Sequence, residues 1–118
     1  MITVKEVFGT EADCTCAEFG VTPKENDRVF AMSGECGGAG VTRLENGAIR
    51  IGAFKTDGDA LCRELLLRTL LLDATRVKNF KVVMEQDGDY AQYGFKKLNG
   101  EWSANSDNII FPHECKGE

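Results

Sequence analysis

The sequence predicts an α+β domain with a mixed, mainly antiparallel central sheet and one long helix packed against it. A leucine-rich segment from Ala60 to about Val77 is too long and too helix-prone to be a strand. Short apolar segments on either side of it are separated by glycine-containing turns, which is typical of strands. The dipeptide Asn46-Gly47 favours a tight type I′ hairpin, because both central residues of that turn have positive φ.

The composition indicates that residues 1–118 form one compact domain. The 118 residues are 42% hydrophobic and 28% charged, with 13 glycines and 2 prolines. A chain of this length buries roughly two thirds of its unfolded surface, so it can form a core without cross-links or a metal ion. No internal repeat or low-complexity segment divides it.

The first half of the chain predicts a strand, a helix and an antiparallel meander. Apolar and polar residues alternate from Ile2 to Phe8, and Thr10 is a candidate cap for a helix from Glu11 to Phe19. Three further strands follow, joined by a glycine-rich turn over residues 34–38 and by the Asn46-Gly47 hairpin. We expect them at Val29–Met32, Val41–Leu44 and Ala48–Lys55.

After the long helix, the sequence predicts a buried strand, a short helix and two final strands. Asn99-Gly100 marks either another hairpin turn or a bulge. We expect the strand at Phe80–Met84, the short helix at Asp87–Tyr93, and the final strands at Lys96 to Leu98 or Trp102 and at Ile109–Phe111.

Charge and hydropathy limit the classes of partner. The net charge is −5 and no Lys/Arg-rich run is present, which disfavours nucleic acid and anionic membranes and leaves small molecules or cationic groups as the expected partners. The start of the chain, Met1 to Phe8, does not resemble a secretion signal. The most apolar stretch, Ala60 to Ala74, is interrupted by charges and is too short to span a membrane. We therefore expect a cytoplasmic protein.

The five cysteines are expected to remain thiols, because their number is odd and a reducing compartment opposes disulfides. Buried, unreactive thiols are the favoured interpretation. Cys62 is also a candidate reactive thiol, since it lies near a helix start and beside Arg63.

A metal or redox site is a further hypothesis for four residues at opposite ends of the chain. A C-x-C or H-x-C pair in an extended strand places both ligands on one side, and thiolate and imidazole ligands suit zinc. Such a site requires the two pairs to meet in space, and incidental thiols are the favoured alternative. The residues are Cys14, Cys16, His113 and Cys115.

The segment Tyr90-Ala91-Gln92-Tyr93-Gly94-Phe95-Lys96-Lys97 resembles the Y-x-x-x-G-F-x-x signature near the end of the GNAT superfamily of N-acyltransferases. The order of the other expected elements is similar to that family as well. Arg28–Glu35, Val41–Leu44 and Ala48–Lys55 match its second to fourth strands, and Arg63–Ala74 matches its central helix. The chain resembles a short, divergent member of this family.

The resemblance implies acetyl-CoA as cosubstrate, lying where the fourth and fifth strands separate. The backbone of Ala53, Phe54 and Lys55 would pair with its pantetheine arm, and the start of the central helix would hold its diphosphate. The family's loop there reads R/Q-x-x-G-x-G/A. This chain has Asp59 to Glu64 at that place, without a glycine and with a carboxylate at each end, so Arg63 is the residue that offsets their charge.

The same resemblance implies two catalytic roles. Tyr90 aligns with the tyrosine that protonates the departing CoA thiolate, and the alternative is a packed tyrosine with its hydroxyl at the surface. Glu85, at the end of a predicted strand, is a candidate base for the amine, directly or through a water, and the alternative is a solvated carboxylate. The first functional hypothesis is therefore an N-acetyltransferase that acts on a small amine.

Two other functional classes stay open. One is a non-catalytic binding or regulatory protein that keeps the GNAT-like fold, with a homodimer through its C-terminal strands as one arrangement. The other is a small metal- or redox-linked protein that uses Cys14, Cys16, His113 and Cys115.

Overall fold

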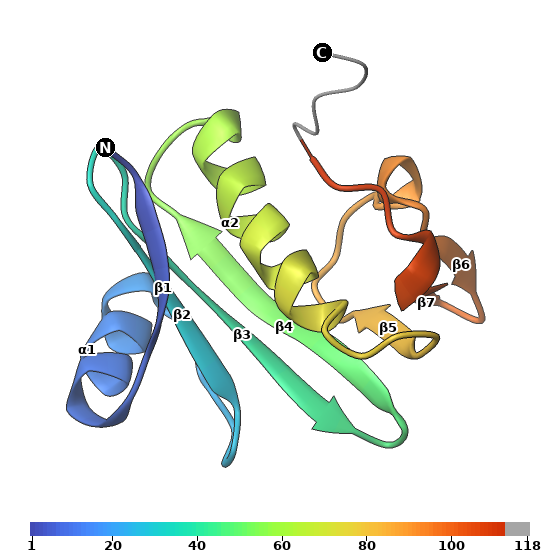
Figure 1. The fold of residues 1–118 in the computed structure, drawn as a ribbon. Coiled ribbons are helices and arrows are strands. Elements are labelled where there is room, and N and C mark those ends of the chain that lie inside the picture. Colours follow the sequence, from blue (N-terminus) through green and yellow to red (C-terminus); the bar gives the residue numbers. More distant parts are fainter. Residues whose placement is uncertain (113–118) are drawn as a thin grey trace.

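The computed structural model describes residues 1–112, which form an α+β fold with a seven-stranded mixed sheet and two α-helices (Figure 1). The sheet order is β1-β2-β3-β4-β5-β7-β6, and every neighbouring pair is antiparallel except β4 and β5, which are parallel. The elements are β1 (Thr3–Val7), α1 (Gly9–Phe19), β2 (Arg28–Ser33), β3 (Gly38–Glu45), β4 (Ala48–Thr56), α2 (Ala60–Ala74), β5 (Lys81–Met84), β6 (Lys96–Leu98) and β7 (Glu101–Asn105), with short 3₁₀ helices at Ala91–Tyr93 and Ser106–Asn108.

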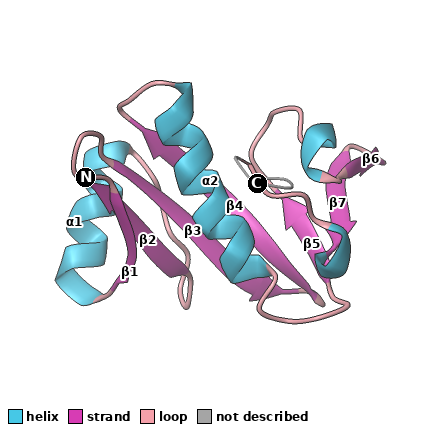
Figure 2. Cartoon of the chain, turned by 45° about the horizontal axis from the view of Figure 1, so that its top comes forward, coloured by secondary structure: helices cyan, strands magenta, loops and turns pink. Residues whose placement is uncertain are grey.

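Helix α2 lies across β3 and β4 and covers one face of the sheet (Figure 2). It begins where the Asp59 carboxylate accepts a hydrogen bond from the backbone N–H of Cys62 at 3.2 Å. Its leucines then form the centre of the larger core, against apolar side chains of β4 and β5. The buried residues of this interface are Leu66, Leu67, Leu70, Leu71, Ala74, Ile49, Ile51 and Val82. The prediction of a long packed helix is confirmed, and it ends at Ala74.

Helix α1 packs against β2 and β3 and forms a separate, smaller core with them. Its N-cap residue is Phe8 rather than Thr10, and the helix begins at Gly9 without a side-chain cap. Gly20 ends it in the left-handed conformation with φ 70°. The core on this side includes Val7, Cys16, Val29 and Val41, so the sheet separates two apolar clusters.

Both predicted asparagine-glycine turns are hairpins. Asn46 and Gly47 have φ of 54° and 73° between β3 and β4, as a type I′ turn requires. Asn99 and Gly100 have φ of 53° and 78° between β6 and β7. The structure therefore has a hairpin rather than a bulge at the second position.

The prediction of a last strand at Ile109–Phe111 is wrong. β7 already has β5 on one side and β6 on the other, so the chain beyond Asn105 has no free sheet edge next to it. It turns through the 3₁₀ helix instead and is held by a 2.9 Å bond from the Ile110 N–H to the Tyr93 carbonyl. Ile109 and Phe111 still pack against the larger core, which accounts for their apolar character.

The expectation that all cysteines remain thiols is wrong for Cys36 and Cys62, which form a disulfide with Cα atoms 6.5 Å apart. Cys36 lies in the loop between β2 and β3, and Cys62 lies in the first turn of α2. Their separation of 26 residues gave no sign of pairing, because it is the folding of α2 onto the sheet that brings them together. Cys14 and Cys16 are free.

Across residues 1–112, neither α-helix has the length and apolar character needed to cross a membrane.

Replacing Leu70 by alanine should lower the free energy of unfolding by about 2 to 5 kcal/mol, because a fully buried side chain leaves a cavity in the larger core. Leu72 is on the same helix but is 49% exposed, so Leu72→Ala should change it by less than about 0.5 kcal/mol. Urea denaturation of both variants measures the difference. Equal losses would contradict the described packing of α2.

Candidate functional site

The candidate site lies where β4 and β5 separate. The parallel pairing of these strands ends at Ile51 and Met84, followed by one 2.9 Å bond from the Glu85 N–H to the Ile51 carbonyl. β4 continues to Thr56, so its last five residues have no strand beside them on that edge. The register with β3 also shifts here, from Ile51 opposite Thr42 to Phe54 opposite Gly40. This bulge at residues 52–53 bends β4 at the point of separation.

A cavity of about 400 Å³ occupies the region between the end of β4 and the start of α2. Three of the residues that the resemblance assigns to cofactor binding line it: Phe54, Lys55 and Arg63. The full lining consists of Phe54, Lys55, Thr56, Gly58, Asp59, Ala60, Arg63 and Gln86. The structure thus brings three of the four predicted cofactor residues together from two different elements.

The fourth predicted residue, Ala53, faces away from this cavity. Its side chain packs against the α1 cluster on the opposite face of the sheet. The bulge explains this placement, because an extra residue interrupts the alternation of side chains along β4. Only the backbone of Ala53 belongs to the edge that β5 leaves open.

The charges around the cavity favour an anion. Arg63 is an exposed cation that lies over the Phe54 ring, with its guanidinium carbon 4.8 Å from the ring centre. Lys55 also lines the cavity, but its ammonium extends toward Gly20 at the end of α1. Of the two carboxylates expected here, Asp59 lines the cavity and caps α2, whereas Glu64 does not line it. The N–H groups of the first helical turn point toward this end of α2. The electrostatic opposition to phosphate is therefore weaker than the sequence indicated.

Gln86 is a cavity residue that the sequence did not single out. Its side-chain oxygen accepts a 2.9 Å hydrogen bond from the Phe54 backbone N–H. The side chain thereby satisfies a donor on the open edge of β4 that a neighbouring strand would otherwise use. Any extended ligand that pairs with this edge must replace that bond. Nothing in the sequence distinguishes Gln86 from other polar residues after a strand.

Tyr90 is buried, with 1% of its surface exposed, and does not line the cavity. Its ring makes edge contacts with Phe95 and Trp102, and its hydroxyl donates to the Asp87 carbonyl at 3.3 Å. Burial raises the pKa of Tyr90, although the neighbouring Arg63 guanidinium acts in the opposite direction. Tyr90 is therefore a protonated phenol in contact with one cavity residue, and not the surface tyrosine of the alternative interpretation.

Glu85 lies on the other face of the sheet, in a network of charged side chains. It pairs with Arg43 on β3 and lies 3.7 Å from Arg50 on β4. Arg43 also donates two hydrogen bonds to Asp27, at 2.8 and 2.9 Å. These bonds raise the pKa of Arg43 and exceed the opposing effect of burial. Glu85 is therefore an ion-paired carboxylate rather than a freely solvated one.

The pKa of Asp27 is lowered in this network. Burial alone would raise it, but the hydrogen bonds from Arg43 and from the Lys24 backbone N–H outweigh that effect. The Asp27 side chain is only 1% exposed. Asp27 is thus a buried carboxylate that stays ionised because Arg43 holds it.

The proposed metal residues are not brought together in the described part of the chain. Cys14 and Cys16 lie on α1, where residues two apart point in nearly opposite directions, and Cys14 is exposed while Cys16 is buried. Their C-x-C spacing therefore does not chelate as it would in a strand. His113 and Cys115 lie outside the described residues. Within residues 1–112 there is no group of three or more candidate metal ligands.

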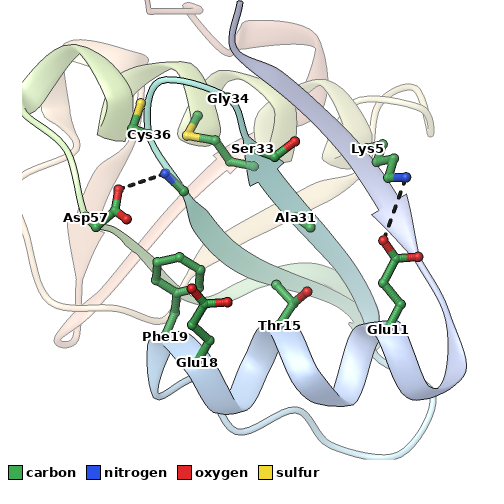
Figure 3. Close-up of a pocket in the computed structure, with 12 residues that line it drawn as sticks. Lys5, Glu11, Thr15, Glu18, Phe19, Ala31, Ser33, Gly34, Cys36 and Asp57 are labelled. Carbon is green, nitrogen blue, oxygen red and sulfur yellow. Dashed lines mark hydrogen bonds and ion pairs between the residues drawn. The ribbon is translucent and has the colours of Figure 1, made fainter.

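A second cleft, of about 430 Å³, lies between α1 and the sheet (Figure 3). Lys5 and Glu11 form an exposed 3.7 Å ion pair at one end of it. At the other end Asp57 accepts a 2.7 Å bond from the Gly37 N–H. None of the sequence-predicted catalytic or cofactor residues lines this cleft.

Comparisons of the chain with models of known protein families, with curated proteins and with solved structures found no match.

Asp27→Asn should lower the free energy of unfolding at pH 7 by roughly 2 kcal/mol, because Arg43 loses a buried charged partner. Asp27 has a lowered pKa when folded, so its contribution is present above its unfolded pKa of about 4 and is lost as the pH falls through the folded value. Denaturation of the two proteins between pH 7 and pH 3 should therefore show a difference that shrinks in acid.

The matched control is Glu101→Gln, which removes a carboxylate that is 40% exposed and lies 3.6 Å from Arg50. This change should have an effect below about 1 kcal/mol at every pH. A difference between Asp27→Asn and the unmodified protein that is independent of pH would contradict the assigned ionisation.

Proposed function

We propose that this chain is an acetyl-CoA-dependent N-acetyltransferase of the GNAT type that acts on a small amine. The observation that carries the proposal is the parallel β4–β5 pair, which separates after Ile51 and Met84 beside the start of α2. The resemblance of the Tyr90–Lys97 segment to the family's signature supports the proposal as well.

The residues around the cavity suit the parts of acetyl-CoA. The open edge of β4 offers backbone donors and acceptors to the amide groups of the pantetheine arm. Arg63 and the N–H groups that open α2 offer positive charge to the diphosphate. Gln86 leaves the Phe54 N–H when the pantetheine arm takes that position.

In the proposed reaction the neutral amine attacks the thioester carbonyl carbon and the carbon–sulfur bond breaks. The nitrogen releases its extra proton to solvent water, from which the Tyr90 phenolate is reprotonated after each turnover. Tyr90 gives its phenolic proton to the departing thiolate, after the 87–89 segment moves enough to admit the sulfur. The raised pKa of Tyr90 keeps that proton in place at neutral pH. The ion pairs of Glu85 support a structural role better than a role as the base for the amine.

Titration calorimetry with acetyl-CoA tests the binding step through two opposite changes. Arg63→Met keeps the apolar stem over Phe54 but removes the charge, so it should weaken binding about tenfold. Asp59→Asn keeps a helix cap but removes the carboxylate, so it should strengthen binding by about twofold or more. Arg76→Met, at the other end of α2, is the control and should have no effect. Absence of binding to the unmodified protein would refute the proposal.

Tyr90→Phe should lower kcat by about 100-fold and leave the acetyl-CoA affinity within about twofold, because only the proton donor is removed. Tyr93→Phe changes the other tyrosine of the same segment, which is also buried, and should leave kcat unchanged. Rates are measured with a panel of small amines by thiol release. Equal rates for Tyr90→Phe and the unmodified protein would remove the assigned role.

A non-catalytic acyl-CoA-binding or regulatory protein is the second candidate. The burial of Tyr90 favours it, since the phenol must become accessible before it can protonate a thiolate. Binding of acetyl-CoA without turnover of any amine would support this candidate. A homodimer through the C-terminal strands would use the edge strand β6, where Leu98 is 64% exposed. A cytoplasmic location, with no nucleic acid or membrane partner, completes the proposal.

A further inference from the structure

The Cys36–Cys62 disulfide lies behind the wall of the candidate cavity. Gly58 and Asp59 line the cavity and immediately precede α2. A Cβ atom on Gly58 would lie 2.4 Å from Cys62 Sγ and 2.8 Å from Cys36 Cβ, so the backbone at Gly58 rests directly against the disulfide. The segment that would receive the diphosphate therefore has the S–S bond as its support.

We propose that this disulfide is a reversible redox latch that fixes the cavity wall at the start of α2 and thereby controls ligand binding there. The proposal rests on the proposed acetyl-CoA site for its functional consequence. The latch itself follows from the position of the bond, which joins the β2–β3 loop to the first turn of α2.

Breaking the bond must displace the wall. Reduction replaces one covalent bond by two thiols, and sulfur atoms that are not bonded need a van der Waals separation of about 3.5 to 4.0 Å. Both cysteines are buried, at 5% and 8% exposure, so the reduced pair has little space in which to separate. Gly58 is exposed, lies against the sulfur of Cys62, and belongs to a segment without helix or strand. Gly58 and Asp59 are therefore the residues that move, while Asp57 stays bonded to Gly37.

The geometry also favours re-formation of the bond. Asp57 accepts a 2.7 Å hydrogen bond from the Gly37 N–H, and its own N–H donates to the Gly37 carbonyl at 3.0 Å. These two bonds link the same two segments that the disulfide joins. After reduction they keep Cys36 and Cys62 near each other, so an oxidant can re-form the bond without a large movement of either segment.

The exchange is balanced with a dithiol as the reductant. A thiolate of the dithiol attacks Cys36 Sγ, the S–S bond breaks, and Cys62 leaves as a thiolate at the N-terminal turn of α2. The second thiol of the reductant then displaces Cys36, so the reductant becomes a disulfide and the protein gains two thiols and two protons. A reducing compartment breaks the Cys36–Cys62 bond and loosens the cavity wall, and a disulfide oxidant re-forms the bond.

Hydrogen exchange tests the latch without any ligand. Treatment with excess dithiothreitol should release two additional thiols toward Ellman's reagent. It should also raise the amide exchange of residues 58–63 by about tenfold, while residues 96–105 of the β6–β7 hairpin stay unchanged. Cys14→Ser removes an exposed free thiol and should respond to dithiothreitol as the unmodified protein does. Unchanged exchange at residues 58–63 after confirmed reduction would overturn the latch.

Acetyl-CoA titration tests the functional consequence. Reduction should weaken binding by about fivefold or more, because the loosened wall must be ordered again when ligand binds. The Cys36→Ser/Cys62→Ser double variant should bind as the reduced protein does, with or without dithiothreitol. If that variant does not fold, the reduced unmodified protein supplies the comparison.

The outcomes separate the two proposals. Equal affinity in both redox states, with binding present, would overturn redox control of the site. A redox-dependent exchange pattern with no acetyl-CoA binding in either state would refute the proposed function, and the redox-dependent movement of the segment would stand.

Discussion

The candidate site depends on one constraint, which is that β5 ends at Met84 while β4 continues to Thr56. Parallel neighbours that separate leave unpaired backbone groups, and a buried strand edge requires other partners for them. Gln86 supplies one such partner for the Phe54 N–H. The bulge at residues 52–53 bends the free part of β4, and α2 begins at the end of the opening. The cavity between the end of β4 and the start of α2 follows from this separation.

The two faces of the sheet stabilise this geometry by different means. On the α2 face, a continuous apolar core fixes the helix against β4 and β5, so the start of α2 has a defined position. On the other face, Asp27, Arg43, Glu85 and Arg50 form an ion-pair network across β3, β4 and the end of β5. This network joins β4 to the residue that follows β5 just where the backbone pairing stops. Glu85, which the resemblance assigned to catalysis, is therefore placed to link β4 to the end of β5 through its ion pairs.

The fold could be predicted further than the site. Each expected strand up to Met84 and both helices are present, because their apolar periodicity and their turn residues act locally. Asn46-Gly47 gave the strongest local signal, and its φ values agree with the expected turn. The strand at Ile109–Phe111 failed because its apolar residues indicate burial, and burial alone does not provide a sheet partner. Phe54, Lys55 and Arg63, which the resemblance assigned to cofactor binding, line one cavity, and the resemblance did not point to Gln86, which lines it too.

By itself, the sequence determined the elements, their order, the hairpin turns and the cation Arg63 near the start of α2, since these depend on neighbouring residues. Only the tertiary structure decided which side chains face the opening, that Tyr90 is buried behind Arg63, and that Cys36 meets Cys62. The physical reason is that these contacts join residues far apart in the chain. They form only when α2 packs on the sheet and β4 separates from β5, and no local pattern records that geometry.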